Sequence, residues 1–357
     1  MITKNNFNLS NQISNFSHEE IIYCNDEKLG LKAIIGIHST TLGPSIGGTR
    51  MWNYKSEKEA LNDVLRLSRA MTLKSSLAGL NAGGGKAVII GDIKLKSENF
   101  IKKFASFIND LNGKYWTAQD VNMSSQDMIW MKEVTPYVVG MPIELGGLGD
   151  SSFPTAYGVY LGMKAASKFV FGSDSLEGKK IGIQGVGKVG SKLVNYLIKE
   201  KAKIYISDIN SEHLKAVSNN SSVKILSNRD IFSFKLDIFS PCALGSIFNS
   251  KNIKKLKCKI IAGAANNQLE DDKIHDKELK KHNISYIPDF LINAGGIISV
   301  YHEQIQDLNK EKVFKMTEGI YSKVIDVLKL SKKKHISTNE SAMKIAMDRI
   351  TREKKSH

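Results

Sequence analysis

The sequence has few cysteines and no long apolar run, and both shortages exclude whole classes of protein. Its three cysteines, Cys24, Cys242 and Cys258, are far apart and include no CxxC pair. This excludes a disulfide scaffold and an ordinary zinc finger, and it is typical of a reducing compartment. No stretch approaches the roughly 18 apolar residues that a membrane span requires, and residues 1–16 lack the apolar core of a signal peptide. We therefore expect a soluble, cytoplasmic protein that has no membrane partner.

Acidic residues are scarce relative to basic ones, which raises the question of a nucleic-acid partner. The chain has 51 lysines and arginines against 36 acidic residues, a net charge of +15, and residues 331–357 hold eight basic and three acidic residues. The lysines are nevertheless scattered over separate segments, and no RNP-type aromatic strand or interleaved arginine and aromatic pattern accompanies them. We expect solvated surfaces and consider nucleic acid an improbable partner. No cluster of His, Cys and acidic residues has metal-ligand spacing, so no metal site is predicted.

Alternating strand-like and helix-like segments predict an α/β fold in two domains. The length of 357 residues exceeds one comfortable hydrophobic core, and a composition of 41% apolar and 24% charged residues is that of an ordinary globular protein. In the first part, Leu61, Val64 and Leu65 recur at helical spacing. The strands predicted there are 31–39 and 86–92, and the predicted helices are 57–74 and 97–113.

A second α/β domain is predicted after a segment rich in glycine and serine, 140–154, which is typical of a hinge or linker. A long helix is expected at 155–172. From residue 179 strands and helices alternate again, which favours a largely parallel sheet, and the chain from about residue 310 is expected to be helical. The predicted divisions are a domain at 1–142, a domain at 143–330 and a basic helical tail at 331–357.

One glycine-rich sequence stands in the context that a dinucleotide site requires. Gly185, Gly187 and Gly190 form a GxGxxG motif that follows an apolar strand and opens a helix. Such glycines permit a tight turn, the approach of a pyrophosphate and close helix packing. Asp208 ends the next strand, where an acid accepts hydrogen bonds from the ribose 2′-hydroxyl and repels a 2′-phosphate. A glycine turn followed by a surface aspartate would give the same pattern, but the context favours NAD over NADP. The residues predicted to bind it here are Gln184, Gly185, Val186, Gly187, Lys188, Val189, Gly190 and Asp208.

Two lysines and an aspartate of the first domain are candidates for acid–base chemistry. Lys74 ends a predicted helix, and Lys86 follows three glycines at the entrance to an apolar strand. A lysine that lies beside apolar walls and near another cation has a pKa lowered toward neutrality, so it can act as a base. Asp120 follows a strand-like segment, where catalytic groups of α/β proteins tend to lie. Exposed lysines beside a glycine turn and a turn-capping aspartate would explain the same spacing, so both interpretations stay open on spacing alone.

Several blocks of the sequence resemble the Glu/Leu/Phe/Val amino-acid dehydrogenase family, especially its leucine/phenylalanine branch. They follow the family order from about residue 30 to about residue 300, and the blocks that carry the lysines are long and specific. The blocks are GPSIGGTRMW (43–52), MTLKSSLAGLNAGGGKAVIIGD (71–92), TAYGVYLGMKAA (155–166), LEGKKIGIQGVG (176–187), PCALG (241–245), IAGAANNQL (261–269) and PDFLINAGG (288–296).

The resemblance implies reversible oxidative deamination of an L-amino acid to a 2-oxo acid and ammonia, without a metal. Lys74 resembles the lysine that binds the substrate α-carboxylate, and Gly47 would lie against the substrate backbone. Lys86 resembles the lysine that activates the water attacking the imine carbon. Asp120 resembles the acid that shuttles protons to and from the amino group.

The same resemblance implies how the cofactor and the domains are arranged. Thr155, Asn266 and Asn293 match family positions that hold the nicotinamide of NAD, and Asn293 also approaches the substrate. In the family the substrate domain comes first and the Rossmann-type NAD domain second, with a cleft that closes between them. The resemblance also implies a homo-oligomer built through the first domain.

The substrate side chain is expected to be aliphatic. Glutamate-specific relatives carry a lysine where this chain has Ile46, and burying a glutamate γ-carboxylate against Ile46 and Val300 would cost several kcal/mol. Ala118, Met71, Ile297 and Val300 match positions that line the side-chain pocket in the leucine branch, although they could simply pack a core. Phenylalanine enzymes tend to have glycine where Ala118 stands. The prediction is therefore a branched-chain substrate, leucine preferred.

Three departures from the family pattern bear on substrate and closure: Gln119 replaces a glutamate, NMSSQ (122–126) replaces a GTT-like run, and Phe153 precedes Pro154. Three alternatives stay open. A dehydrogenase of phenylalanine or another aromatic amino acid would differ in its substrates, and a non-catalytic NAD-binding module with a basic surface would bind DNA in a salt-dependent way without turnover. A 2-hydroxy-acid dehydrogenase would need a catalytic histidine–acid pair, and His282 and His302 are not in such a setting.

Overall fold

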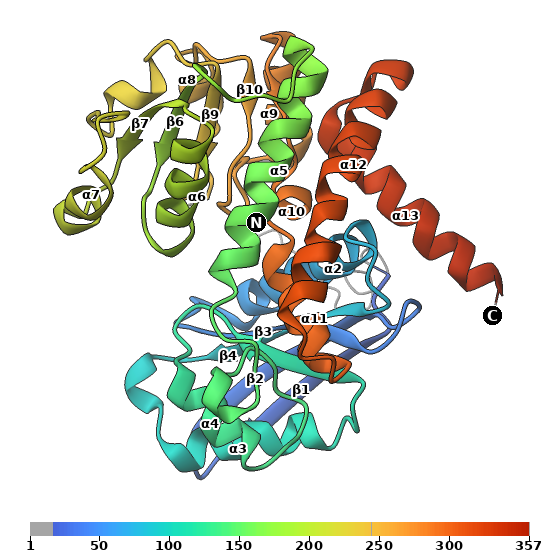
Figure 1. The fold of residues 1–357 in the computed structure, drawn as a ribbon. Helices are drawn as coiled ribbons and strands as arrows, with labels where there is room; N and C mark the ends of the chain where they lie inside the picture. Colours follow the sequence, from blue (N-terminus) through green and yellow to red (C-terminus); the bar gives the residue numbers. More distant parts are fainter. Residues whose placement is uncertain (1–16, 244, 357) are drawn as a thin grey trace, which may run out of the picture. The chain divides into compact units, whose positions relative to one another are not determined.

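The computed structural model describes residues 17–243 and 245–356, and within them the chain forms two compact units (Figure 1). The N-terminal segment 1–16, for which no signal peptide is predicted, lies outside the described residues. In the described part of the chain no helix is long and apolar enough to cross a membrane. The first unit comprises Met1–Gly149, Val300–Leu308 and Arg349–His357, and the second comprises Asp150–Ser299 and Asn309–Asp348. The contiguous ranges predicted from the sequence, 1–142, 143–330 and 331–357, do not include these returns of the chain to the first unit.

The first unit is built on a five-stranded mixed sheet in the order β1-β2-β4-β3-β5. Its strands are β1 (Glu20–Asp26), β2 (Leu31–Ser39), β3 (Ser45–Trp52), β4 (Gly83–Ile90) and β5 (Tyr115–Gln119). Strand β2 pairs antiparallel with β1 and β4, whereas β3 pairs parallel with β4 and β5. Its helices are α2 (Glu57–Leu77), α3 (Glu98–Asn109) and α4 (Ser125–Lys132), with short 3-10 turns η1 (Ile93–Leu95) and η2 (Ile143–Leu145).

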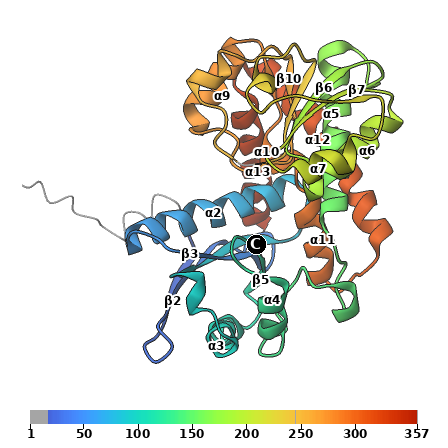
Figure 2. The same cartoon turned by 90° about the vertical axis from the view of Figure 1, so that its left-hand side faces the viewer.

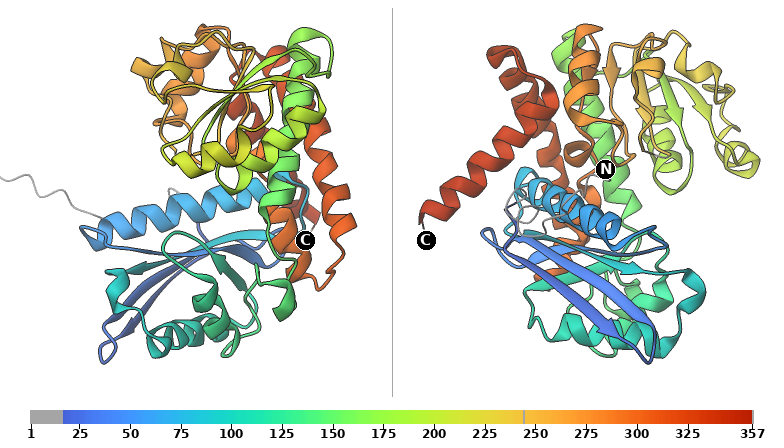
Figure 3. Two further views of the ribbon diagram at one scale, coloured as in Figure 1. Left: turned by 60° about the vertical axis from the view of Figure 1, so that its left-hand side comes forward. Right: turned by 180° about the vertical axis from the view of Figure 1, so that it is seen from behind.

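Helices cover both faces of this sheet, so each face has its own core. Helix α2 lies along one face, and α3 and α4 lie on the other (Figures 2 and 3). The Oγ of Ser56 accepts a hydrogen bond from the N–H of Glu59, which caps the N-terminus of α2. The core on the α2 face consists of Ile34, Ala60, Leu61, Val64, Leu65 and Val88. The opposite core includes Ile35, Met51, Ile89, Phe100, Phe104 and Met131.

The three consecutive glycines of the first unit belong to a strand and not to a turn before it. The expectation that the strand begins at residue 86 is corrected, because β4 begins at Gly83 and includes Gly84 and Gly85. A Cβ on Gly84 would lie 2.0 Å from the backbone nitrogen of Thr72 on α2. Only glycine therefore lets α2 approach the middle of the sheet this closely.

The second unit has the strand order of a dinucleotide-binding fold. All its strands are parallel, in the order β11-β10-β9-β6-β7-β8. Numbered along the chain from β6, this is the 3-2-1-4-5-6 order of the Rossmann fold, and the strand order reverses between β6 and β9. The strands are β6 (Lys180–Gln184), β7 (Lys203–Ser207), β8 (Val223–Ile225), β9 (Ile238–Pro241), β10 (Ile260–Ile261) and β11 (Ser285–Tyr286). The predicted α/β class with a Rossmann-type C-terminal domain is confirmed.

The helices of the second unit include two long ones, α5 and α12, that lie side by side (Figures 1 and 3). The helices are α5 (Ser152–Phe171), α6 (Lys188–Lys199), α7 (Ser211–Val217), α8 (Ser250–Ile253), α9 (Asp272–Lys281), α10 (Asp289–Ile292) and α12 (Lys310–Lys334), with a short 3-10 turn η3 (Asp230–Phe232). Two more helices, α11 (Gly295–Gln304) and α13 (Thr338–Ser356), begin in the second unit and end in the first. His335, in the left-handed conformation, ends α12, so the expected helical segment after residue 310 is two helices.

Replacing Gly84 with alanine tests the close packing of α2 on β4. The Cβ would collide with backbone, which cannot move aside as a side chain can, so we expect the Gly84→Ala protein to lose about 3 kcal/mol of unfolding free energy. Urea unfolding measures this loss. The matched control is Gly319→Ala on α12, where a Cβ meets no atom within 4 Å and should stabilise the helix by about 0.5–1 kcal/mol. Equal effects of the two substitutions would contradict the packing argument.

Candidate active site

Three charged side chains meet on the α2 face of the first unit. The Nζ of Lys86, on β4, lies 2.8 Å from Oδ2 of Asp120, which directly follows β5. The Nε of Arg50, on β3, donates to the same oxygen at 3.0 Å. The Lys86 side chain is only 7% exposed and that of Asp120 is 25% exposed. The structure therefore brings together the two predicted catalytic residues and adds an arginine.

The register of the sheet explains how side chains from three strands can meet. Strand β3 lies between β4 and β5, and Gly48 on β3 pairs with Ala118 on β5. A Cβ on Gly48 would lie 2.8 Å from the Cβ of Asp120. Because Gly48 has no side chain, Asp120 can occupy the space above β3 and reach Lys86 on the far strand.

Burial and neighbouring charges set the protonation of this pair. Burial lowers the pKa of Lys86, the positive charge of Arg50 lowers it further, and the carboxylate of Asp120 opposes both. Burial alone would raise the pKa of Asp120, but the charges of Lys86 and Arg50 outweigh it and hold that pKa below its ordinary value. The lysine therefore releases its proton more readily than usual while the aspartate stays ionised. This is the arrangement that a general base next to a fixed anion requires.

Four other predicted substrate residues of the first unit lie on α2 and β3. Lys74 is half-buried in the last turn of α2. A Cβ on Gly47 would lie 3.4 Å from Met71 on α2, so these two predicted residues are neighbours. Ile46 is fully buried in β3.

A second group of predicted side-chain-pocket residues surrounds Gly140. A Cβ built there would lie 3.7 Å from Val300 and 3.9 Å from Ala118. The carboxylate of Glu303 accepts hydrogen bonds from the backbone N–H groups of Gly140, Met141 and Leu148. Glu303 thus fixes the loop that passes this group, and nothing in the sequence analysis pointed to it.

The glycine-rich turn of the second unit has the geometry that the motif requires. Gly185 follows β6 in a left-handed conformation, φ +92°, which a side chain rarely adopts. A Cβ on Gly190 would lie 2.0 Å from the carbonyl oxygen of Gly185, whereas Gly187 has open space around that position. Gly187 is also the N-cap of α6. The turn is thus close-packed beneath and open at the helix N-terminus, where a pyrophosphate would bind.

Asp208, which follows β7, also fixes the conformation of this turn. Its Oδ2 accepts a hydrogen bond from the N–H of Val186 at 2.8 Å, and its Oδ1 accepts one from the N–H of Asn210 at 2.8 Å. Burial would raise the pKa of Asp208, but these backbone donors outweigh it and lower the pKa. The carboxylate is therefore ionised beside the turn, where it would repel a further anion.

Two buried amides of the second unit have acceptor oxygens to which the described residues offer no donor. Asn293 donates from Nδ2 to Oδ1 of Asn266 at 2.6 Å and to the carbonyl of Ala264 at 3.0 Å. Its own Oδ1, like Oε1 of Gln184 at the end of β6, is buried without a hydrogen-bond partner. A bound dinucleotide can supply such donors through its carboxamide and ribose groups, so the residues present fit this cofactor. Thr155 on α5, the remaining predicted nicotinamide residue, donates from Oγ1 to the carbonyl of Ser151, the N-cap of this helix. Ile297 is buried on α11.

The departures from the family pattern at the end of β5 and just after it have structural roles. Gln119 donates from Nε2 to the carbonyl of Met123, and Asn122 donates from Nδ2 to the carbonyl of Met51. Ser124 forms a capping box with Asp127 at the start of α4. The altered residues therefore brace the loop that carries Asp120.

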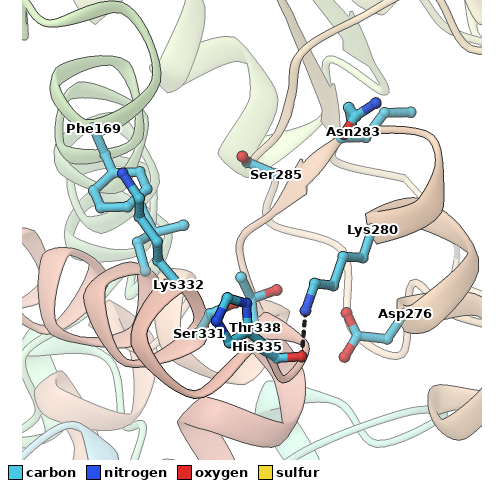
Figure 4. A pocket seen from close by; sticks show the side chains of 11 residues that line it. Phe169, Asp276, Lys280, Asn283, Ser285, Ser331, Lys332, His335 and Thr338 are labelled. Carbon is cyan, nitrogen blue, oxygen red and sulfur yellow. Dashed lines mark hydrogen bonds between the residues drawn. The ribbon is translucent and has the colours of Figure 1, made fainter.

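A pocket of about 360 Å³ lies within the second unit, and none of the predicted site residues lines it (Figure 4). Helices α9 and α12 contribute Asp276, Lys280 and Lys332 to its lining, and Lys280 donates to the carbonyl of His335 at 2.6 Å. Asp276 accepts a hydrogen bond from the N–H of Asn339 in the first turn of α13.

Among the described residues no group of three or more His, Cys, Asp or Glu side chains is placed to hold a metal ion.

A Rossmann unit joined to a unit that carries a buried lysine–aspartate pair is the arrangement expected of a dehydrogenase. Residues 18–137 match the family model "Glu/Leu/Phe/Val dehydrogenase, dimerisation domain", and residues 206–357 match "Glutamate/Leucine/Phenylalanine/Valine dehydrogenase". The chain belongs to the Glu/Leu/Phe/Val dehydrogenase family. It is therefore an oxidoreductase of the amino-acid dehydrogenase type, and the resemblance stated from the sequence is confirmed.

Known relatives differ in the amino acid that their names give. The leucine dehydrogenase of Thermoactinomyces intermedius is 47% identical over 336 residues, 94% of this chain and 91% of that protein. The phenylalanine dehydrogenase of Caldalkalibacillus thermarum is 43% identical over 339 residues, 93% of this chain and 91% of that protein. The crystal structure of L-tryptophan dehydrogenase from Nostoc punctiforme has a TM-score of 0.87 and 39% identity, and covers 97% of this chain and 100% of its own.

The buried Asp276 generates a prediction about stability and pH. Burial raises the pKa of Asp276 to about 6, so the folded protein binds this proton more tightly than the unfolded chain does. The resulting cost to stability is fully present above pH 6 and disappears below the unfolded value near 3.9. We expect Asp276→Asn to raise the unfolding free energy at pH 8 by up to about 3 kcal/mol and to have little effect at pH 4.

Urea unfolding at the two pH values measures the Asp276 effect. Glu177→Gln, at an exposed position of the same unit, removes one negative charge and serves as the control. A loss of stability that is equal at pH 8 and pH 4 would show that Asp276 acts only through its hydrogen bonds.

Proposed function

We propose that the protein catalyses the reversible, NAD-dependent oxidative deamination of a branched-chain L-amino acid, with leucine preferred, to the 2-oxo acid and ammonia. The observation that carries the proposal is the buried contact of Lys86 with Asp120 at 2.8 Å. We assign the substrate and the catalytic lysines to the domain at 1–142 and the dinucleotide to the domain at 143–330. We also propose that the protein is cytoplasmic and forms a homo-oligomer, in keeping with a family model named as a dimerisation domain.

The residues divide the reaction between them. Lys74 holds the α-carboxylate of the substrate, and Gly47 lies against the substrate backbone. A bound nicotinamide would supply the acceptor for the hydride that leaves the substrate Cα. Lys86 then takes a proton from water as the water adds to the imine carbon. Asp120 accepts this proton from the Lys86 ammonium and passes it to the departing amine, which leaves as ammonia. Lys86 then takes the hydroxyl proton as the carbonyl of the 2-oxo acid forms.

The side-chain pocket supports an aliphatic substrate. Ile46 is fully buried and apolar, so a glutamate γ-carboxylate placed against it would lose its hydration without gaining a cation. Ala118 supplies a methyl group beside Val300 and Gly140, which reduces the room for an aromatic ring. One methyl group changes substrate preference by only about 1–3 kcal/mol, so leucine is a preference within a range of related substrates.

The position of Asp208 supports NAD over NADP. Its ionised carboxylate lies against the glycine-rich turn through the N–H of Val186. From there it can accept hydrogen bonds from a ribose hydroxyl and would repel a 2′-phosphate. The buried acceptors of Gln184 and Asn293 support the presence of a bound cofactor at this edge of the sheet.

The test is reduced-cofactor formation at alkaline pH with L-leucine, L-valine, L-isoleucine, L-phenylalanine and L-glutamate in turn, each with NAD and with NADP. We expect the fastest turnover with leucine and NAD. Lys86→Ala should be slower by about 10³-fold, because it lacks the general base, while its circular dichroism spectrum stays unchanged.

Each other result overturns a named part of the proposal. Fastest turnover of phenylalanine would overturn the pocket argument, and a preference for NADP would overturn the role of Asp208. Full activity of Lys86→Ala would overturn the role of Lys86. No turnover with any amino acid would overturn the proposed activity, and salt-dependent DNA binding would then favour a non-catalytic module with a basic surface.

A further inference from the structure

Arg50 connects the catalytic aspartate to a second carboxylate that the proposed reaction does not use. Its Nε donates to Asp120 at 3.0 Å, and its Nη1 donates to Oδ2 of Asp63, on α2, at 3.1 Å. The side chains of Arg50 and Asp63 are 22% and 27% exposed, so their interaction is only partly screened by solvent. A guanidinium that donates in two directions fixes the positions of both carboxylates.

A tyrosine is also hydrogen-bonded to Asp63. The hydroxyl of Tyr54 donates to Oδ2 of Asp63 at 2.6 Å. Burial, and then the contact with Asp63, raise the pKa of Tyr54, so Tyr54 remains a neutral donor. The row therefore runs Tyr54, Asp63, Arg50, Asp120, Lys86 and contains two negative and two positive charges. We call it the charge row.

We propose that Arg50, held by Asp63 and Tyr54, is a positioning residue that keeps Asp120 ionised and aligned on Lys86 and thereby sets the pH at which Lys86 becomes a base. The inference rests on the proposed function, because it assigns a regulator of basicity to the same site. Arg50 is not assigned a contact with the substrate.

The geometry gives the direction of the effect. Lys86 and Arg50 share one oxygen of Asp120, so the lysine ammonium receives only part of the stabilisation that this carboxylate can give. Without Arg50, Asp120 would pair with Lys86 alone, and the charged form of Lys86 would persist to higher pH. The shared carboxylate thus makes Lys86 a better base near neutral pH.

Asp63 has the opposite effect, because it neutralises Arg50. The charged groups with the largest effects on Lys86 are Asp120 after β5, Arg50 on β3 and Asp63 on α2. Helix α2 also carries Lys74, and the neighbouring strand β2 carries His38. Tyr54 is the last member of the row, and the fully buried Tyr115 of β5 is influenced by the charge of Asp120. Burial raises the pKa of both tyrosines, so both stay neutral. Removing the charge of Asp63 leaves the charge of Arg50 uncompensated, and Lys86 should then lose its proton at lower pH.

The test compares Arg50→Gln, Asp63→Asn and Arg50→Lys with the unmodified protein. Arg66→Gln removes a positive charge from the exposed face of α2 and serves as the control. The first readout is kcat/KM for leucine and NAD as a function of pH. Relative to the unmodified protein, we expect the midpoint of the rising limb to move up by about one pH unit in Arg50→Gln and down in Asp63→Asn. Arg50→Lys keeps the positive charge, so its midpoint should lie between those of Arg50→Gln and the unmodified protein. The KM for leucine should change little.

The second readout does not depend on turnover. Competitive acetylation with acetic anhydride, followed by mass spectrometry of the peptide that contains Lys86, gives the pH at which this amine becomes reactive. We expect the same opposite shifts in Arg50→Gln and Asp63→Asn, and none in Arg66→Gln. Should Arg50→Gln fail to fold, the other two variants still test the inference. The midpoint should move down in Asp63→Asn and move up in Arg50→Lys, by less than is expected for Arg50→Gln.

The outcomes separate this inference from the proposed function. An unchanged acetylation midpoint in Arg50→Gln overturns the inference even where activity falls. Shifts of the same sign in Arg50→Gln and Asp63→Asn also overturn it, because general damage to the site would explain them. Opposite acetylation shifts in a protein that oxidises no amino acid would support the charge row while overturning the proposed function.

Discussion

Burying the ammonium of Lys86 inside a sheet is the constraint on which the site of the first unit depends. A buried charge without a partner would cost several kcal/mol, so the fold must place a carboxylate within reach. Asp120 provides it at 2.8 Å, and Gly48 leaves the space that this contact crosses. Burial still lowers the pKa of the lysine. The interaction that makes Lys86 tolerable in the core therefore leaves it useful as a base.

In both units, glycines allow close packing around the functional groups. In the first, Gly84 lets α2, which carries Lys74 and Met71, approach the sheet closely, and Met71 lies next to Gly47. In the second, Gly190 lets α6 begin directly against the turn after β6, and Asp208 holds that turn through a backbone amide. In each unit, a glycine allows backbone segments to approach one another closely. A carboxylate then fixes the position of the functional group.

Residue types and their order along the chain predicted much of the fold and of the candidate site. The remaining features depend on contacts between residues that are far apart in the sequence. Lys86 and Asp120 were predicted from their neighbours and from the family resemblance, and the alternation of apolar segments predicted the α/β class. The glycines before Lys86 were left out of the predicted strand, because their need to pack against α2 is visible only in three dimensions. Arg50 was missed because its partner Asp120 is 70 residues away. Asp208 was expected only to meet a ribose, and its bond to Val186 depends on the spacing of two strands.

The most direct test of this account is the protonation of Lys86 in the native protein. Carbon-13 NMR of protein labelled at lysine Cε follows each amine with pH, and Lys86→Arg assigns the signal of Lys86. The account predicts that Lys86 titrates below the ordinary lysine value of about 10.4. A signal that titrates at or above that value would contradict it, because the contact with Asp120 would then hold a permanently charged ammonium and no base would be available at the centre of the site.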